Sequence, residues 1–235
     1  MSGHSKWSTI KHQKASTDAK RGKLFSKLAR AITLATQSGG TDPGANLRLR
    51  MTIEAAKGAN MPKDNIERAV ERAKGSGGVL EEILYEGYGP GGVAVMVEVA
   101  TDNRNRTAQE IKNIFERSGG SLAGPGAVSF LFSQKGLILV DAGSDSENTT
   151  LSLIDLGVPD FEETDDGIEL FIEPGEFAVW REKVTQGGFV VKSAELVYKP
   201  KSYITVGNEV TGKVASLIEA LDDSDDVQRV FTTIH

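Results

Sequence analysis

A glycine-rich segment, GSGG at residues 75–78, separates two parts of the chain that have different hydrophobic periodicities. Before it, apolar residues recur every three or four positions, which is the spacing of an amphipathic α-helix. Three such stretches follow one another, and their connections contain glycine or proline. They span residues 17–37, 43–58 and 62–75. Short helices joined by tight turns predict a small helical bundle.

After the glycine-rich segment, strand-like and helix-like stretches alternate. Residues 135–205 contain them in the order β-α-β-β-α-β, which is typical of a split βαβ or ferredoxin-like unit. A helix and a strand follow at 206–234 and have no partners nearby in the sequence. They could complete a sheet that is left open at Phe132, in which case the β-α-β-β-α-β block is an insertion.

The predicted fold class is therefore α+β, with an N-terminal three-helix bundle followed by two α/β ferredoxin-like domains, one inserted in the other. The predicted domains are residues 1–78, residues 79–134 together with 206–235, and residues 135–205.

Charge is divided unevenly along the chain, whose formal net charge is −6. Residues 1–75 contain 15 Lys and Arg against 6 Asp and Glu, whereas residues 76–235 contain 12 against 27. This asymmetry indicates that the N-terminal part meets a polyanion and that the rest does not. The alternative interpretation is that the charges only solvate the surface.

The first predicted helix gathers its cations on one face. At about 100° per residue, four of them fall within about 80° of one another, on the side away from the apolar residues. They are Lys20, Lys23, Lys27 and Arg30. Such a row can neutralise successive phosphates of a nucleic acid and release their counterions. Arg21 departs from the pattern because it falls on the apolar side.

The segment before this helix adds Lys6, Lys11 and Lys14 together with Trp7. On nucleic acid, lysines hold the backbone and a tryptophan can stack on a base. The alternative is that the tryptophan packs on the bundle as an anchor. Two histidines of this segment have no third ligand in view, which favours surface roles over metal binding.

Other cations of the predicted bundle could widen the surface, although some are expected to pair with nearby acids on the same helix. They are Arg48, Arg50, Lys63, Arg68 and Arg72.

The segment TDNRNRT lies where a predicted strand ends and a helix begins. One of Thr101, Asp102 and Asn103 can cap that helix. Arg104 and Arg106 would then project near a helix N-terminus, where backbone N–H groups attract anions. Capping combined with ordinary solvation explains the same residues equally well.

Several classes of function lack their sequence signatures. The chain has no cysteine, which excludes disulfides, thiolate metal sites and a cysteine nucleophile. It contains no phosphate-binding loop followed by Lys-Ser/Thr, no HExxH and no GxSxG. Its longest apolar run, VAVMV at residues 93–97, is far too short to span a membrane. The sequence therefore predicts a non-enzymatic protein without a metal, a cofactor or a membrane segment.

Four blocks of the sequence resemble the YebC/PmpR family, which includes the mitochondrial translational activator of cytochrome c oxidase. They are GHSKW with the following IKH and DAKRGK, then NMPKDNIERA, then YEGYGPGGVAVMVE with TDNRNRT, and finally GAVS. The resemblance covers essentially the whole chain and implies a helical bundle followed by two α/β domains, one inserted in the other.

The resemblance also implies a function. Bacterial members are described as probable transcriptional regulators that bind promoter DNA, and other members act in translation, where they associate with ribosomes and help with proline-rich stretches. Because the GHSKW block begins at Gly3, a mitochondrial presequence is not expected, although the basic N-terminus would suggest one. The resemblance thus implies a cytoplasmic protein of a bacterium.

The combined prediction is a regulatory factor that binds DNA through its basic bundle. The alternative is a ribosome-associated translation factor that binds ribosomal RNA. Phosphate would repel the acidic α/β domains, which could instead serve as a platform for a protein partner. The predicted nucleic-acid contacts are Lys6, Trp7, Lys11, Lys14, Lys20, Lys23, Lys27, Arg30, Arg48, Arg50, Arg104 and Arg106.

Overall fold

The computed structural model describes residues 18–75 and 79–234, with side chains from residue 21 onward. Within these ranges the chain forms two compact units. The larger unit consists of residues up to 132 together with 200–234, and the smaller unit consists of residues 133–199. The smaller unit therefore interrupts the larger one in sequence. The predicted further division of the larger unit near residue 78 stays a prediction.

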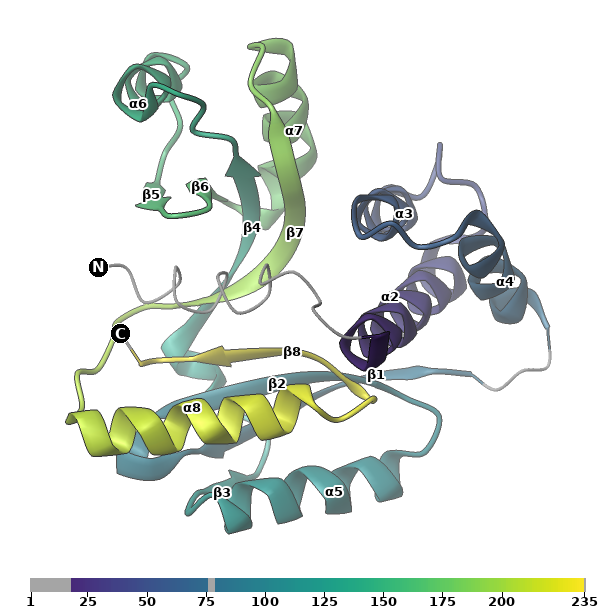
Figure 1. Ribbon diagram of the computed structural model, residues 1–235, viewed down its shortest axis with the longest axis vertical. Coiled ribbons are helices and arrows are strands. Elements are labelled where there is room, and N and C mark those ends of the chain that lie inside the picture. The colour runs from purple at the N-terminus through teal and green to yellow at the C-terminus, as the bar shows by residue number, and fades with distance from the viewer. Residues whose placement is uncertain (1–17, 76–78, 235) are drawn as a thin grey trace. The chain divides into compact units, whose positions relative to one another are not determined.

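The N-terminal part of the larger unit is the predicted three-helix bundle. Helix α2 spans Asp18–Gly39, α3 spans Leu47–Gly58 and α4 spans Lys63–Lys74 (Figure 1). Ile32 of α2, Leu49 of α3 and Ile66 of α4 are buried in one apolar cluster. Helical periodicity places such residues on one side of each helix, so that burying them holds the three helices together.

The helix α3 begins later than predicted because a turn precedes it. The side chain of Asp42 accepts a hydrogen bond from the backbone N–H of Gly44 at 2.8 Å, which closes a local turn. The helix cap is Asn46, whose side-chain oxygen accepts from the N–H of Leu49 at 3.0 Å. The amide nitrogen of the same side chain donates to the carbonyl of Ala35 at 2.7 Å. One buried side chain therefore joins α2 to the start of α3.

A four-stranded sheet in the order β3-β1-β2-β8 forms the rest of the larger unit. Its strands are β1 Glu81–Tyr88, β2 Ala94–Thr101, β3 Ser121–Ala123 and β8 Val227–Thr232. Two helices pack on it, α5 Arg104–Arg117 and α8 Asn208–Asp222 (Figure 1). Strand β8 pairs antiparallel with β2, so that the C-terminal segment completes the sheet as predicted.

Two glycines show that α5 and α8 cover the same face of this sheet. A Cβ atom added to Gly87 would lie 2.7 Å from a ring carbon of Phe115, which is fully buried on α5. Two residues further on, a Cβ atom added to Gly89 would lie 3.1 Å from Leu217 of α8. Only glycine at the first position allows the aromatic ring of α5 to approach the strand so closely.

The chain leaves the larger unit and returns to it at neighbouring points. The backbone N–H of Lys201 donates to the carbonyl of Leu131 at 2.8 Å. The loop just before the exit is held by the buried carboxylate of Glu86, which accepts three backbone N–H groups of residues 126–129 at 2.7–2.8 Å. Burial alone would raise the pKa of Glu86, but these hydrogen bonds outweigh it and the pKa is lowered.

The smaller unit contains the predicted β-α-β-β-α-β order in a second four-stranded sheet, with strand order β5-β6-β4-β7. Its elements are β4 Phe132–Val140, α6 Ser146–Asp155, β5 Phe161–Thr164, β6 Gly167–Ile172, α7 Phe177–Gln186 and β7 Val191–Pro200. This arrangement, with the first sheet and the bundle, confirms the α+β fold class. Of the helices in the described ranges, none combines the length and the hydrophobicity that crossing a bilayer requires.

One carboxyl group of the smaller unit is buried without a full set of partners. Glu169 of β6 is 3% exposed, and one of its carboxylate oxygens has no hydrogen-bond partner among the described residues. Glu162 lies directly opposite it on β5. Burial first, and then the negative charge of Glu162, raises the pKa of Glu169 to about 7, and the nearby cation Lys199 offsets this only in part.

We expect the Glu169→Gln variant to be more stable than the wild type at about pH 8 and to lose this advantage at about pH 5. The folded-state pKa lies above the ordinary value of 4.5, so the wild type loses stability as the pH rises from the ordinary value toward about 7. The gap between the two pKa values corresponds to about 3 kcal/mol. Urea unfolding at both pH values measures the effect, and the exposed Glu163→Gln serves as the control. An advantage that is the same at both pH values would contradict this account.

Candidate nucleic-acid interface

Five of the twelve predicted nucleic-acid contacts cannot be placed. Lys6, Trp7, Lys11 and Lys14 lie outside the described residues, and so does the side chain of Lys20. Their proposed roles stay predictions. The other seven belong to the larger unit, where their surroundings are described.

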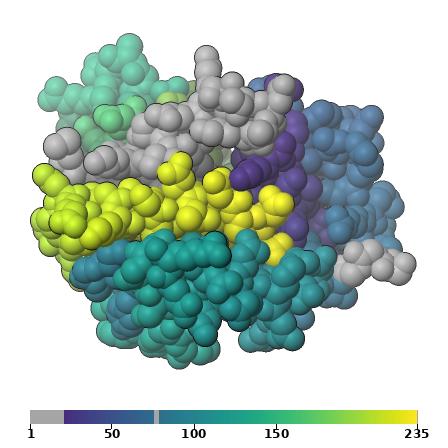
Figure 2. All heavy atoms as spheres, turned by 60° about the horizontal axis from the view of Figure 1, so that its bottom comes forward, coloured from purple at the N-terminus to yellow at the C-terminus, as the bar shows by residue number. Residues whose placement is uncertain are grey.

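The sequence predicts that the cationic face of α2 binds phosphate. In the structure its described cations Lys23, Lys27 and Arg30 pair with acidic residues at the end of α8 and in the turn that follows it. The Nζ atom of Lys23 lies 2.8 Å from a carboxylate oxygen of Asp223. The Nζ atom of Lys27 lies 2.7 Å from the carbonyl oxygen of Asp222 and 3.4 Å from its carboxylate. Figure 2 shows the same arrangement, with the purple start of α2 against the yellow residues that follow α8.

The reason for this contact is electrostatic. A helix ends with unpaired carbonyl groups and a partial negative charge, and α8 adds acidic side chains at the same place. Lysines on a neighbouring helix satisfy both. The role of this face in binding phosphate stays a prediction, and in the chain by itself Lys23, Lys27 and Arg30 already have anionic partners.

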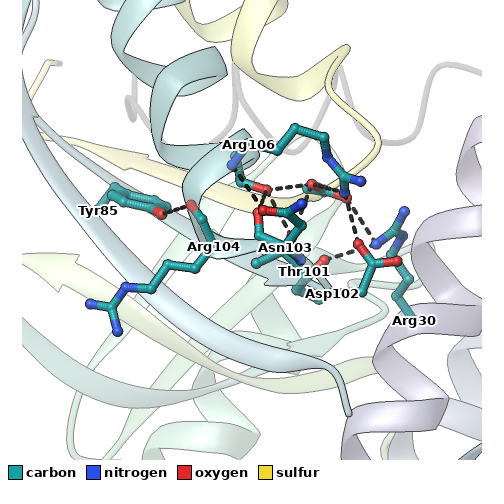
Figure 3. A network of polar contacts seen from close by, with 10 residues as sticks. Arg30, Tyr85, Thr101, Asp102, Asn103, Arg104 and Arg106 are labelled. Atoms are coloured by element: carbon teal, nitrogen blue, oxygen red, sulfur yellow. Dashed lines mark hydrogen bonds and ion pairs between the residues drawn. The ribbon is translucent and has the colours of Figure 1, made fainter. Parts of the chain in front are cut away.

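The innermost of these contacts is a buried carboxylate with three hydrogen-bond donors and a further ion pair. Asp226, in the turn between α8 and β8, forms an ion pair with Arg30 of α2 at 2.8 Å and accepts a hydrogen bond from Arg106 of α5 at 3.0 Å. The hydroxyl groups of Thr107 and Thr101 donate to it at 2.5 Å and 3.2 Å. Arg30 and Arg106 approach from different helices toward this one place (Figure 3). The carboxylate therefore connects the bundle, the end of β2, the start of α5 and the C-terminal segment.

The charge of Asp226 is stabilised by these donors. Burial alone would raise the pKa of Asp226, but the hydrogen bonds from Thr107 and Arg106 and the positive charges of Arg30 and Arg106 outweigh it. The pKa of Asp226 is therefore lowered, and the group stays ionised at neutral pH.

The two arginines of the TDNRNRT segment have different surroundings. Asn103 caps α5, because its side-chain oxygen accepts from the N–H of Arg106 at 3.1 Å. The guanidinium group of Arg106 pairs with Asp102 at 2.9 Å as well as with Asp226. The side chain of Arg104 is exposed and points away from this network (Figure 3). Of the two, Arg106 already has two anionic partners, whereas Arg104 forms no ion pair with a described residue.

The remaining predicted contacts also differ. Arg48 of α3 pairs through both terminal nitrogens with Glu82 of β1. Arg50 is half-buried, forms no ion pair with a described residue, and its Nε atom has no hydrogen-bond partner there. Arg48 thus ties the bundle to the sheet, whereas no described residue supplies an anion to Arg50.

The bundle has other cations besides the predicted contacts, and of these Lys57 is not considered in the sequence analysis. Arg68 forms no ion pair with a described acid, since it donates to the carbonyl of Asp64 and to the side chain of Asn65. The bundle cations without an ion pair to any described residue are Arg21, Arg50, Lys57, Arg68 and Arg72. Summing charge over each helix would not have indicated them, because α2 has the largest excess of cations over acids and α4 has the smallest. Among the described residues, no group of three or more acidic or histidine side chains is placed to hold a metal ion.

Comparisons with protein families and with individual relatives agree on one family. Residues 5–76 match the family described as TACO1/YebC protein N-terminal domain, and residues 80–234 match TACO1/YebC second and third domain. The chain is 46% identical over 233 residues to a probable transcriptional regulatory protein of Trichlorobacter lovleyi, with 98% of this chain and 94% of the relative covered. It is 49% identical over 235 residues to one of Finegoldia magna, with 98% and 97% covered.

A solved structure also resembles this fold closely. The crystal structure of a conserved hypothetical protein from Aquifex aeolicus is 44% identical in sequence and superposes with a TM-score of 0.91. The match covers 98% of this chain and 97% of the other.

We expect Asp226→Asn to destabilise the larger unit by about 3 kcal/mol, because it leaves Arg30 partly buried without its anion. The lowered pKa of Asp226 means that its contribution is present above the ordinary carboxyl pKa and is lost as the pH falls through the folded value. The difference between variant and wild type should therefore shrink in acid. Urea unfolding measures it, with the exposed Asp225→Asn of the same turn as the control. Equal stability of the two variants at neutral pH would refute the role given to Asp226.

Proposed function

This chain belongs to the TACO1/YebC family, and we propose that it is a regulator of gene expression that binds DNA through its basic N-terminal bundle. The relatives named above are called probable transcriptional regulatory proteins, which supports a regulatory role and names no reaction. The bacterial cytoplasm is the proposed location, and the acidic α/β part is the proposed platform for a protein partner.

The observation that carries the proposal is an excess of positive charge in the bundle that ion pairs among the described residues do not neutralise. Residues 18–75 contain 12 Lys and Arg against 6 Asp and Glu. The five bundle cations Arg21, Arg50, Lys57, Arg68 and Arg72 form no ion pair with a described residue. A phosphate backbone supplies the missing anions and releases counterions on binding.

The charge of the rest of the chain supports an oriented encounter. Residues 76–235 contain 12 Lys and Arg against 27 Asp and Glu, so that a polyanion repels most of this part. Binding would therefore occur with the bundle toward the nucleic acid. The residues Lys6, Trp7, Lys11, Lys14 and Lys20 remain proposed contacts of the same kind.

The alternative is a translation factor that binds ribosomal RNA. Contacts to phosphate position a protein without selecting a base sequence, and they serve duplex DNA and folded RNA alike. The names of the relatives favour DNA, and a comparison of the two polymers decides between them.

We expect the triple variant Arg21→Gln, Lys57→Gln, Arg72→Gln to bind a DNA duplex more weakly than the wild type and with a shallower salt dependence. Each lost phosphate contact lowers the slope of log K against log salt by about 0.9. Fluorescence anisotropy over a salt series, with a ribosomal RNA hairpin in parallel, measures both effects.

The matched control is Lys112→Gln, Lys201→Gln, Lys213→Gln, which removes three exposed cations from the α/β part. This control should bind as the wild type does, because its lysines lie outside the bundle. An equal loss of DNA affinity in the two triple variants would contradict the assignment of binding to the bundle. Tighter binding of the RNA hairpin than of DNA at equal salt would favour the translation factor.

A further inference from the structure

The acidic turn, defined as residues 222–226 with the sequence DDSDD, faces the cations of α2. We infer that this turn stands in for phosphate on α2, and that nucleic acid binds there by displacing the turn from Lys23 and Lys27. The inference rests on the proposed function and deepens it. The second phosphate-binding surface of the bundle is formed by Lys23 and Lys27 of α2, and the acidic turn competes with phosphate for it.

The acidic turn offers α2 the same chemistry as a phosphate chain. The Nζ atom of Lys23 is held by the carboxylate of Asp223 at 2.8 Å and by its carbonyl oxygen at 3.2 Å. The Nζ atom of Lys27 is held by the carbonyl oxygen of Asp222 at 2.7 Å and by its carboxylate at 3.4 Å. Two lysines about one helical turn apart thus meet two anionic groups in succession, as they would along a phosphodiester backbone.

Exposure decides which of these contacts can exchange. The side chains of Lys23 and Asp223 are 44% and 69% exposed, and an ion pair of this kind is worth little in water. Asp226 is 5% exposed, accepts three hydrogen bonds and pairs with Arg30, which is itself mostly buried, so that this ion pair is far less open to exchange. The outer end of the acidic turn can therefore leave α2 while the inner end keeps the bundle attached to the sheet.

Asp222 can leave Lys27 only if another anion takes its place. Burial lowers the pKa of Lys27, and the charge of Asp222 opposes this effect. Without an anion beside it, the partly desolvated ammonium group would be unfavourable. A phosphate that arrives as Asp222 leaves supplies the required partner, whereas simple opening of the turn into water does not.

The competition also selects the class of ligand. Because the turn occupies two lysines at once, a ligand must present at least two phosphates at a similar spacing to replace it. The measured association constant equals the intrinsic constant multiplied by the fraction of molecules in which the acidic turn has left the two lysines. The acidic turn thus sets a threshold that favours polymers with dense phosphates over isolated phosphate groups.

The test compares two double variants that remove the same charge. Asp222→Asn with Asp223→Asn removes the carboxylates that contact α2. Glu219→Gln with Asp225→Asn removes two nearby exposed carboxylates that form no ion pair with a described residue of α2. Binding of a random-sequence DNA duplex and of a ribosomal RNA hairpin is measured at fixed moderate salt, after thermal unfolding has shown that each variant is folded.

We expect Asp222→Asn with Asp223→Asn to tighten binding of the duplex about tenfold, and the control pair to change it by less than about twofold. Adding Lys23→Gln and Lys27→Gln to the first pair should abolish the gain, because the lysines are the groups that it releases.

If both pairs tighten binding equally, or if neither pair tightens it while the wild type binds, the inference is overturned and the proposed function stands. If neither the wild type nor any variant binds either polymer, both are overturned. If only binding of the RNA hairpin tightens, the acidic turn competes with a ligand for these lysines as inferred, and that ligand is RNA.

Discussion

The interaction on which the larger unit depends is the burial of one ionised carboxylate, that of Asp226. A desolvated anion is tolerated only when cations and hydrogen-bond donors surround it, and here these partners come from the bundle, the end of β2 and the start of α5. Arg30 comes from the bundle, Thr101 from the end of a strand, and Arg106 from the start of a helix. Their convergence sets how the bundle lies against the sheet, and it thereby brings the lysines of α2 beside the end of α8.

The local features of this fold could be predicted because each depends on residues close in sequence. The faces of α2 follow from a helical repeat, and Asn103 caps α5 three residues before the N–H that it accepts. The partners of those faces could not be predicted in the same way. Lys23 and Asp223 are separated by 200 positions, and nothing near either residue indicates the other. For the same reason, Arg104 and Arg106 look alike in sequence, although only the second meets Asp226.

Buried acids are treated in two opposite ways in the two units. Glu86 is surrounded by backbone N–H groups of a nearby loop, which keep its charge and fasten that loop. Glu169 lies opposite another glutamate and lacks a partner for one oxygen, so that its neutral form is favoured. The first arrangement adds to the order of the fold, whereas the second makes the smaller unit sensitive to pH. Burial alone, which the hydrophobic pattern indicates, does not distinguish them.

The hydrogen bond between Lys201 and Leu131 has a consequence for how this architecture can change over generations. The two ends of the interruption lie side by side, and the host sheet takes no strand from residues 133–199. A short peptide could bridge the gap without rethreading the host, as could an unrelated module with adjacent termini. Residues 133–199 can therefore diverge or be replaced in evolution while the larger unit retains its own hydrogen-bonding pattern.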